Sequence, residues 1–182
     1  MEYFNLKLLN MIVPIFNNSN NANPEYSNPN DAGCDLRADF SRVSVDNPIK
    51  LYGDGGIIFA GESHPLTMLR LEPGCRAIIP TGIYTAIPEG YEIQLRPRSG
   101  MAIKKGLTII NTPGTIDAGY RNEWGIPVIN LGFETVWIED KERIAQAVLN
   151  KVEKIEWENY NLRDITSMGV NRGGGFGHSG SK

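Results

Sequence analysis

Short apolar runs, each bounded by proline, glycine or asparagine, recur along the whole chain. Examples are LKLLNMIV, AIIP, GIYTAIP, YEIQL, LTII and IPVINL. Turn signals lie between them, such as Glu72-Pro73-Gly74 and Pro88-Glu89-Gly90. Short strands with turn residues between them are typical of all-β sandwiches, barrels and jelly rolls. The pattern therefore predicts an all-β domain.

One segment, RPRSGMAIKKGL, is typical of a short helix. Ser99 is suited to be the N-cap, the helix would run through Met101 to Lys105, and Gly106 would end it. The two lysines fall in the last turn, where the helix dipole favours cations. We therefore expect one short helix within the β fold.

The segment KERIAQAVLNKVEKIEW can be interpreted in two ways. Ile144, Val148, Val152 and Ile155 recur at a period near 3.6, which indicates a helix. The β-branched content and the strand-rich surroundings favour a strand instead.

Three stretches have the composition of surface decoration. They are the asparagine-rich run over residues 17–30, the stretch YGDGGIIFAGESHP over residues 52–65, and the glycine-rich end of the chain. We expect one β domain over residues 1–170, with an insertion at 52–65 that includes a hairpin on DGG. A flexible arm over residues 171–182 would follow, because its composition cannot pack alone.

Composition places the chain among ordinary globular proteins. The 182 residues are 41% hydrophobic and 21% charged, with a net charge of -3. This charge supplies no basic field for a nucleic-acid partner. The N-terminus resembles neither a signal peptide nor a spanning helix, so we expect no membrane association and a cytoplasmic location, or the host cytoplasm for a viral protein. The two distant cysteines, Cys34 and Cys75, indicate free thiols in a reducing compartment.

Several common sites can be excluded from the sequence. The two histidines, His64 and His178, do not lie with cysteines or acids at metal-ligand spacing. There is no GxSxG elbow, and no glycine-rich loop is followed by Lys-Ser or Lys-Thr as in a P-loop. Candidate chemistry remains in five stretches: DAGCDLRA, RPRSG, NTPGTIDAGYRNEW, RIAQAVL and NRGGGFGHSG.

The first two stretches offer a carboxylate and an anion site. Asp35 follows a glycine at the start of an expected strand, where an aspartate is either a turn former or a ligand. Arg98, with the amides of Ser99 and Gly100 at a helix N-terminus, can bind phosphate. The alternative is an N-cap beside a surface arginine.

The next two stretches place polar residues in apolar surroundings. If NTPGTIDAGYRNEW forms a hairpin, alternation puts Asp117 on one face and Ile116 and Tyr120 on the other. Asp117 could then be a general base over a flat substrate. Arg143 and Gln146 are the polar members of RIAQAVL, and structural hydrogen bonding is the default interpretation for both.

Taken together and in this order, the five stretches resemble the five sequence motifs of the trimeric deoxyuridine triphosphatases (dUTPases). The similarity extends from Ala32 to Gly180 through AGCDLRA, PRSG, GTIDAGYRNEW, RIAQ and GGFGHSG. The segment IPTGIYTAIPEGY also resembles the framework between the first and second motifs. The resemblance implies a distorted jelly roll (β-clip) and a homotrimer with active sites at subunit boundaries.

The resemblance also implies an activity and roles for individual residues. The family hydrolyses dUTP to dUMP and pyrophosphate with Mg²⁺ by water attack on the α-phosphate, which supplies dUMP for dTTP synthesis and keeps uracil out of DNA. Asp117 matches the aspartate that orients and deprotonates the water, and Asp35 matches the carboxylate that holds the metal through water. Gln146 is the second expected catalytic residue and contacts phosphate. The matches in substrate binding are Arg98, Ser99, Gly100, Asn111, Gly114, Thr115, Ile116, Tyr120, Arg172, Phe176, Gly177 and Ser179.

Within these matches, Tyr120 corresponds to the tyrosine packed against the deoxyribose, and Asn111 belongs to the uracil-reading element. We expect the arm to close over bound nucleotide, with Phe176 on the uracil and Arg172 at the terminal phosphate. Two differences from the family pattern are visible. Asn122 replaces a frequent glycine, and Arg172 lies one residue nearer to Phe176 than the usual arginine.

Two other functions compete with dUTP hydrolysis. A dCTP deaminase, or a bifunctional deaminase and diphosphatase, shares the fold but requires a glutamate some ten residues past the aspartate. The segment from Trp124 to Phe133 contains no acid. A catalytically silent regulatory binding protein is the second alternative, and the intact Asp35, Asp117, Tyr120 and Phe176 argue against it.

Overall fold

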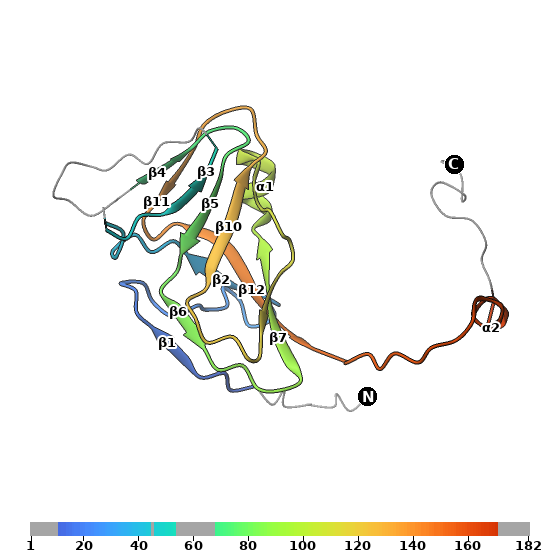
Figure 1. The fold of residues 1–182 in the computed structure, drawn as a ribbon. Helices are drawn as coiled ribbons and strands as arrows, with labels where there is room; N and C mark the ends of the chain where they lie inside the picture. Colours follow the sequence, from blue (N-terminus) through green and yellow to red (C-terminus); the bar gives the residue numbers. More distant parts are fainter. Residues whose placement is uncertain (1–10, 45, 54–67, 171–182) are drawn as a thin grey trace, which may run out of the picture. The chain divides into compact units, whose positions relative to one another are not determined.

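The computed structural model describes residues 11–44, 46–53 and 68–170 of the 182-residue chain. Within these ranges strands predominate (Figure 1). The strands are β1 (Ile15–Asn17), β2 (Cys34–Arg37), β3 (Lys50–Tyr52), β4 (Met68–Leu71), β5 (Arg76–Pro80), β6 (Ile83–Thr85), β7 (Tyr91–Pro97), β8 (Leu107–Ile109), β9 (Gly114–Asp117), β10 (Gly125–Asn130), β11 (Val136–Glu139) and β12 (Arg143–Lys151). The helices are α1 (Ser99–Lys105) and α2 (Leu162–Ser167). The all-β prediction is confirmed, and α2 is a second helix that the pattern does not predict.

The strands form two four-stranded antiparallel sheets and two strand pairs. One sheet has the order β3-β5-β10-β8 and the other β2-β12-β7-β9, while β1 pairs with β6 and β4 with β11. Neighbouring strands are mostly distant in sequence, as β12 between β2 and β7 illustrates. These crossing connections between two facing sheets form the predicted jelly roll.

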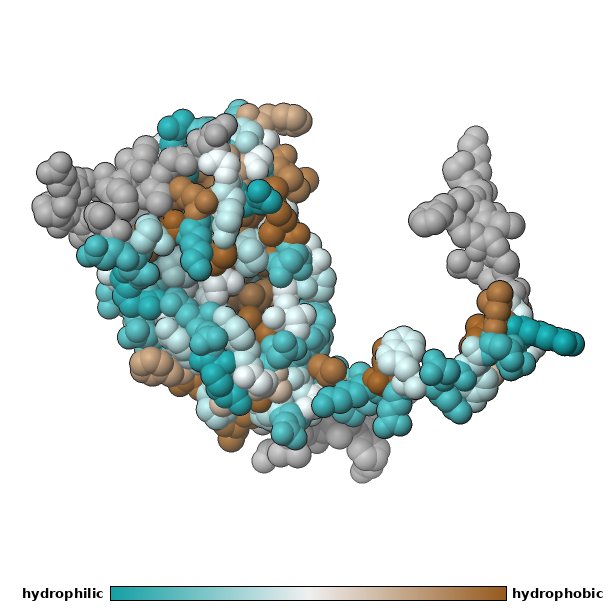
Figure 2. Space-filling view, viewed as in Figure 1, coloured by the Kyte–Doolittle hydropathy of each residue, from teal (hydrophilic) through white to brown (hydrophobic). Residues whose placement is uncertain are grey.

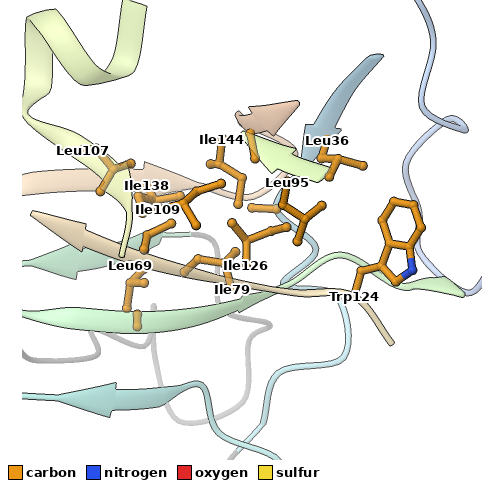
Figure 3. Close-up of a cluster of buried hydrophobic side chains, with 14 of the residues drawn as sticks. Leu36, Leu69, Ile79, Leu95, Leu107, Ile109, Trp124, Ile126, Ile138 and Ile144 are labelled. Carbon is orange, nitrogen blue, oxygen red and sulfur yellow. The ribbon is translucent and has the colours of Figure 1, made fainter. Parts of the chain in front are cut away.

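The hydrophobic core lies between the two sheets. Strand β10 alternates half-buried and buried residues, and β9 alternates buried and exposed ones, as a sheet with one face in the core requires. Figure 3 shows side chains from both sheets meeting in this space: Leu36, Leu95 and Ile144 from one, and Ile79, Ile109 and Ile126 from the other. All six are at most 2% exposed.

Both turns expected from Pro-Gly and Pro-Glu-Gly chemistry are present. Gly74 and Gly90 adopt φ values of 78° and 82°, in the left-handed region that glycine tolerates. The amide of Cys75 donates to the carbonyl of Glu72, and that of Tyr91 donates to Pro88. These turns define where β5 and β7 begin.

The predicted helix is confirmed, but its expected N-cap is wrong. Ser99 is the first helical residue, and the flanking residue Arg98 has extended backbone and makes no side-chain cap bond. The carbonyl of Arg98 accepts from the amides of Met101 and Ala102, which places the helix start one residue earlier than expected. Gly106 ends the helix in the left-handed conformation, as predicted.

The ambiguous segment KERIAQAVLNKVEKIEW contains the longest strand of the described ranges, and its helical interpretation is wrong. Strand β12 pairs with β2 along one edge and with β7 along the other. Both edges of its backbone are therefore hydrogen-bonded within the sheet, which outweighs the helical periodicity of its apolar residues.

The chain divides into two compact units, residues 1–152 and residues 153–182. The described part of the second unit consists of an extended segment and α2, which Asn161 caps by accepting from the amide of Asp164. The expected arm at 171–182 and nearly all of the expected insertion at 52–65 lie outside the described residues.

Asn130 fixes the end of β10 from inside the core. Its side chain is fully buried and donates from Nδ2 to the carbonyls of Leu71 (2.9 Å) and Glu134 (2.8 Å). Its Oδ1 accepts from the amide of Gly132 at 2.9 Å. One side chain thus joins β4, β10 and the loop before β11.

We expect Asn130→Ala to lower the free energy of unfolding by about 2–4 kcal/mol, because it leaves one buried and two part-buried backbone groups without their partner. The control is Asn150→Ala, whose half-buried amide bonds only the nearby carbonyl of Val148. That change should shift the stability by less than about 1 kcal/mol. Urea denaturation of both variants measures the difference, and equal losses would contradict this role for Asn130.

Candidate active site

One face of the sheet β2-β12-β7-β9 carries a row of polar side chains. Gln146 of β12 lies opposite Asp35 of β2 on one side and Arg96 of β7 on the other. Directly opposed residues in an antiparallel pair project to the same side of the sheet. The other face carries Ile93 and Leu95, which belong to the core.

Asp35 joins two arginines at the end of this row. Its Oδ1 accepts from Nε of Arg98 at 2.8 Å, and its Oδ2 accepts from an Nη of Arg143 at 2.9 Å. Arg98 also donates to the carbonyl of Arg143 at 3.2 Å. The carboxylate thereby holds two guanidinium groups together that would otherwise repel each other.

These residues line a polar cavity of about 340 Å³. Ser99 and Gly100 at the start of α1 form one wall, and the first amides of a helix have no partner within the helix. Asp31 and Asp35 supply the carboxylates of the cavity lining, and Arg98 and Arg143 supply its guanidinium groups. The cavity therefore combines anion-binding groups with carboxylates.

Gln146 lies in this cavity in a fixed orientation. Its Nε2 donates to the carbonyl of Pro97 at 3.0 Å, which uses one of its two hydrogens. Its Oε1 lies against Gly33, where an added Cβ would approach that oxygen to 2.6 Å. Glycine at position 33 is thus required for the observed placement of Gln146.

The stretch from Asn111 to Asp117 forms a turn and strand β9. The side-chain amide nitrogen of Asn111 lies beside Gly114. It is 3.4 Å from the position that a Cβ on residue 114 would take. Along β9, Thr115 and Asp117 are exposed, and Gly114 and Ile116 are buried. The predicted placement of Asp117 and Ile116 on opposite faces is confirmed.

Tyr120 follows in the turn after β9 and packs against the core, on the side predicted for it. Its amide donates to the carbonyl of Asp117 at 3.0 Å, and its hydroxyl donates to the carbonyl of Glu123 at 2.9 Å. Hydrogen bonds therefore hold Tyr120 both at its backbone amide and at its hydroxyl group.

The predicted residues form two separate groups within one chain. Asp35, Arg98, Ser99, Gly100 and Gln146 share the polar cavity. Asp117 lies opposite Glu92 of β7, whereas Gln146 lies opposite Arg96, so the two are offset by four positions, roughly 13 Å of strand. The residues of the arm, Arg172, Phe176, Gly177 and Ser179, lie outside the described residues.

Sequence reasoning missed the contribution of Arg143 to the cavity. Arg143 lies three residues before Gln146, and its polarity in an apolar segment suggested only structural hydrogen bonding. The β-bulge between Arg143 and Ala145 disturbs the strand alternation there, so the pattern does not predict the direction of this side chain.

The surroundings of Cys34, adjacent to Asp35, favour its neutral thiol. Burial raises the pKa of this thiol, and the negative charge of Asp35 raises it further. Because the thiolate is the reactive form, a raised pKa lowers the reactivity of this sulfur. Both cysteines are free thiols, as predicted.

The fold and the cavity define a class: an all-β jelly-roll protein with a polar cavity, lined by two arginines and two aspartates, at the edge of one sheet. Among the described residues, no helix is long and apolar enough to cross a bilayer.

Comparison with known proteins identifies the family. The dUTPase family model matches residues 66–180. The deoxyuridine 5'-triphosphate nucleotidohydrolase of Finegoldia magna is 44% identical over 170 residues, which cover 93% of this chain and 99% of the relative. That of Fusobacterium nucleatum is 43% identical, with 86% and 88% covered. The chain belongs to the dUTPase family.

Solved structures support the same fold. A mutant dUTPase of Staphylococcus bacteriophage 80alpha, solved with dUpNHpp, has a TM-score of 0.67 and 26% identity, and the match covers 93% of this chain and 98% of that one. A mutant dUTPase from phage phi11 of S. aureus, described as coordinating a structural Mg(II) ion, has a TM-score of 0.61 and 24% identity, with 82% and 97% covered.

We expect Gly33→Ala to reduce kcat/KM by about tenfold or more while leaving the melting temperature nearly unchanged. The new methyl group displaces the end of a flexible side chain, Gln146, and comes within 3.1 Å of a methyl group of Val148, but it meets no backbone atom within 3.4 Å. Steady-state kinetics and thermal denaturation measure the two effects. The control is the same change in a Gln146→Ala background, where it should have little further effect on rate. A full additional loss there would show that Gly33 acts independently of Gln146.

Proposed function

We propose that this protein hydrolyses dUTP to dUMP and pyrophosphate, which supplies dUMP for dTTP synthesis and keeps uracil out of DNA. The observation that carries the proposal is the cluster of Arg98, Arg143 and Gln146 around Asp35 in the polar cavity. The family resemblance supports the proposal that this cluster binds the phosphates of the nucleotide. The deaminase alternative is not favoured, since the relatives are nucleotidohydrolases and Trp124 to Phe133 lacks an acid.

The phosphate chain would occupy the polar cavity. Guanidinium groups bind phosphate through charge-assisted hydrogen bonds, and Arg98 and Arg143 each retain N–H donors beyond those given to Asp35. The hydroxyl of Ser99, the amide of Gly100 and the second Nε2 hydrogen of Gln146 add neutral donors. This set can stabilise the negative charge that grows on the pyrophosphate leaving group.

The base and sugar would lie against the stretch from Asn111 to Tyr120. The amide of Asn111 and the backbone of Gly114, Thr115 and Ile116 can read the polar edge of uracil. A narrow slot of this kind would exclude the methyl group of thymine by steric clash. Bound cytosine would leave hydrogen-bonding groups of the protein without a partner. Tyr120 would pack against the deoxyribose, where a 2′-hydroxyl would clash.

Asp117 would act as the general base. Its exposed carboxylate can orient a water in line with the scissile bond and accept its proton. The water oxygen bonds to the α-phosphorus, the bond from that phosphorus to the bridging oxygen breaks, and pyrophosphate leaves.

The cavity fits a hydrated Mg²⁺. Asp35 and Asp31 both line it, and each oxygen of Asp35 keeps acceptor capacity beyond its single arginine bond. No cluster of three His, Cys, Asp or Glu side chains occurs in the described ranges, so contact through water suits this site better than direct ligation. When bound, the ion would neutralise charge on the phosphates.

The working unit would be a homotrimer with shared active sites. Within one chain, Asp117 is offset from the phosphate cluster by four strand positions, which supports a site that a second copy completes. The second unit supports association, because Figure 2 shows apolar side chains along the segment after Val152. Ile155, Trp157 and Leu162 of this unit are all more than half exposed.

Two further parts of the proposal rest on the sequence. The arm at 171–182 would close over bound dUTP through Phe176, Arg172, Gly177 and Ser179. The cytoplasm is the location that the composition and the two free thiols favour.

We expect the purified protein with Mg²⁺ to release pyrophosphate from dUTP and from no other common nucleoside triphosphate. A coupled pyrophosphate assay and an ammonia assay, run on the same panel, measure this directly. Release of ammonia from dCTP would point to the deaminase, and no turnover of any nucleotide would support a silent binding protein.

We expect Asp117→Asn to reduce kcat by about a thousandfold while a non-hydrolysable dUTP analogue still binds. The substitution keeps the size of the side chain and removes its basicity. Single-turnover kinetics and calorimetry separate the two effects. The matched control is Glu92→Gln, which neutralises the carboxylate directly opposite Asp117 on β7. Substantial residual turnover in Asp117→Asn would remove its assigned role.

A further inference from the structure

The turn that carries Tyr120 has little apolar anchorage of its own. Between Asp117 and Glu123, Arg121 and Asn122 are exposed and only Ala118 and Tyr120 pack against the core. The hydroxyl of Tyr120 donates to the carbonyl of Glu123 at 2.9 Å. The position of that carbonyl therefore decides where the far end of the ring lies.

Glu123 is held by five donors from outside the turn, of which the hydroxyl of Tyr84 is the most distant, at 3.5 Å from Oε2. Its carboxylate accepts a two-pronged pair of bonds from Arg42, at 3.2 Å and 2.6 Å. Its Oε1 also accepts from the amides of Thr81 at 3.1 Å and Gly82 at 2.8 Å. Paired guanidinium–carboxylate bonds fix direction as well as distance, which a point charge does not.

Arg42 is in turn fixed by a buried carboxylate. Its Nε donates at 3.0 Å to Asp39, which is 1% exposed and also accepts from the amide and hydroxyl of Ser41. The hydrogen bonds that Arg42 donates to Glu123, followed by the one that it donates to Asp39, raise the pKa of Arg42 above its ordinary value, so its charge persists at any working pH. All the nitrogens of the Arg42 guanidinium are thus used within this network.

The next residue, Trp124, continues the anchor into the core. Its amide donates to Ile83 at 2.8 Å, its carbonyl accepts from the hydroxyl of Thr81 at 2.7 Å, and its ring is buried (Figure 3). The chain that follows Tyr120 is therefore anchored at Glu123 and Trp124.

We propose that the ion pair between Arg42 and Glu123 positions Tyr120 and thereby sets the discrimination of this site against ribonucleotides. The inference rests on the proposed function, in which Tyr120 lies against the deoxyribose. Arg42 touches no substrate in this account and acts as a positioning residue. Loss of the two-pronged bond lets the Glu123 carbonyl and the Tyr120 ring move away from the sugar, which makes room for a 2′-hydroxyl.

The test compares kcat/KM for dUTP with kcat/KM for UTP in Arg42→Lys, which keeps the charge but not the paired bonds. We expect the dUTP/UTP ratio to fall by about tenfold, mainly through better use of UTP. Glu123→Gln keeps an acceptor for the amides of Thr81 and Gly82 and should also lower the dUTP/UTP ratio. It serves as the second variant if Arg42→Lys does not fold. The control is Lys105→Ala, which removes a different ion pair, to Glu142, and should leave the ratio unchanged.

A double-mutant cycle shows whether Arg42 acts through Tyr120. Tyr120→Phe removes the hydroxyl bond to Glu123 and should lower the ratio alone, and adding Arg42→Lys should change it little further. Rates that fall equally for both nucleotides in Arg42→Lys, or ratio losses that multiply in the double variant, would overturn the inference and leave the proposed function intact. Failure of the wild-type protein to hydrolyse dUTP would overturn both.

Discussion

The antiparallel pairing of β7 with β12 is the constraint on which the rest of the molecule depends. It runs from Ala145 opposite Pro97 to Lys151 opposite Tyr91, and both strands lie inside their sheet. Because side chains alternate along each strand, the same pairing assigns Leu95 to the core and Gln146 to the polar face. A slip of one residue would exchange these faces and remove both the core and the site. The ladder therefore stabilises the fold and positions the chemistry at once.

The close approach of two arginines in the cavity depends on the negative charge of Asp35. Two arginines brought together without a counter-ion would repel each other, and a carboxylate between them removes that cost. Both guanidinium groups keep donors for a further anion. In the proposed function, a phosphate chain would enter a site whose cations are already in position, which is the preorganisation that phosphoryl transfer requires. Asp35 would then serve the arginines and a hydrated metal together, since its two bonds use about half of its acceptor capacity.

The sequence predicted much of this arrangement because the relevant signals are local. Strands such as YEIQL and IPVINL alternate or are bounded by turns, and Gly106 ends α1 by its own backbone freedom. The residue that precedes α1 and the strand conformation of β12 could not be predicted from local signals alone. Arg98 precedes the helix with its side chain bonded to Asp35 and not to the helix, and β12 is a strand because two neighbours pair with it. Such long-range partners are not visible in a local pattern.

The central claim is that dUTP is hydrolysed at a site that combines the phosphate cluster of one subunit with Asp117 of another. Subunit complementation tests it most directly. Arg98→Ala and Asp117→Asn are each expected to be inactive, and coexpressed mixtures of the two contain sites with both native residues. The account predicts that the mixture regains a substantial fraction of wild-type pyrophosphate release from dUTP. A mixture that forms mixed oligomers and stays as inactive as its two components would contradict it.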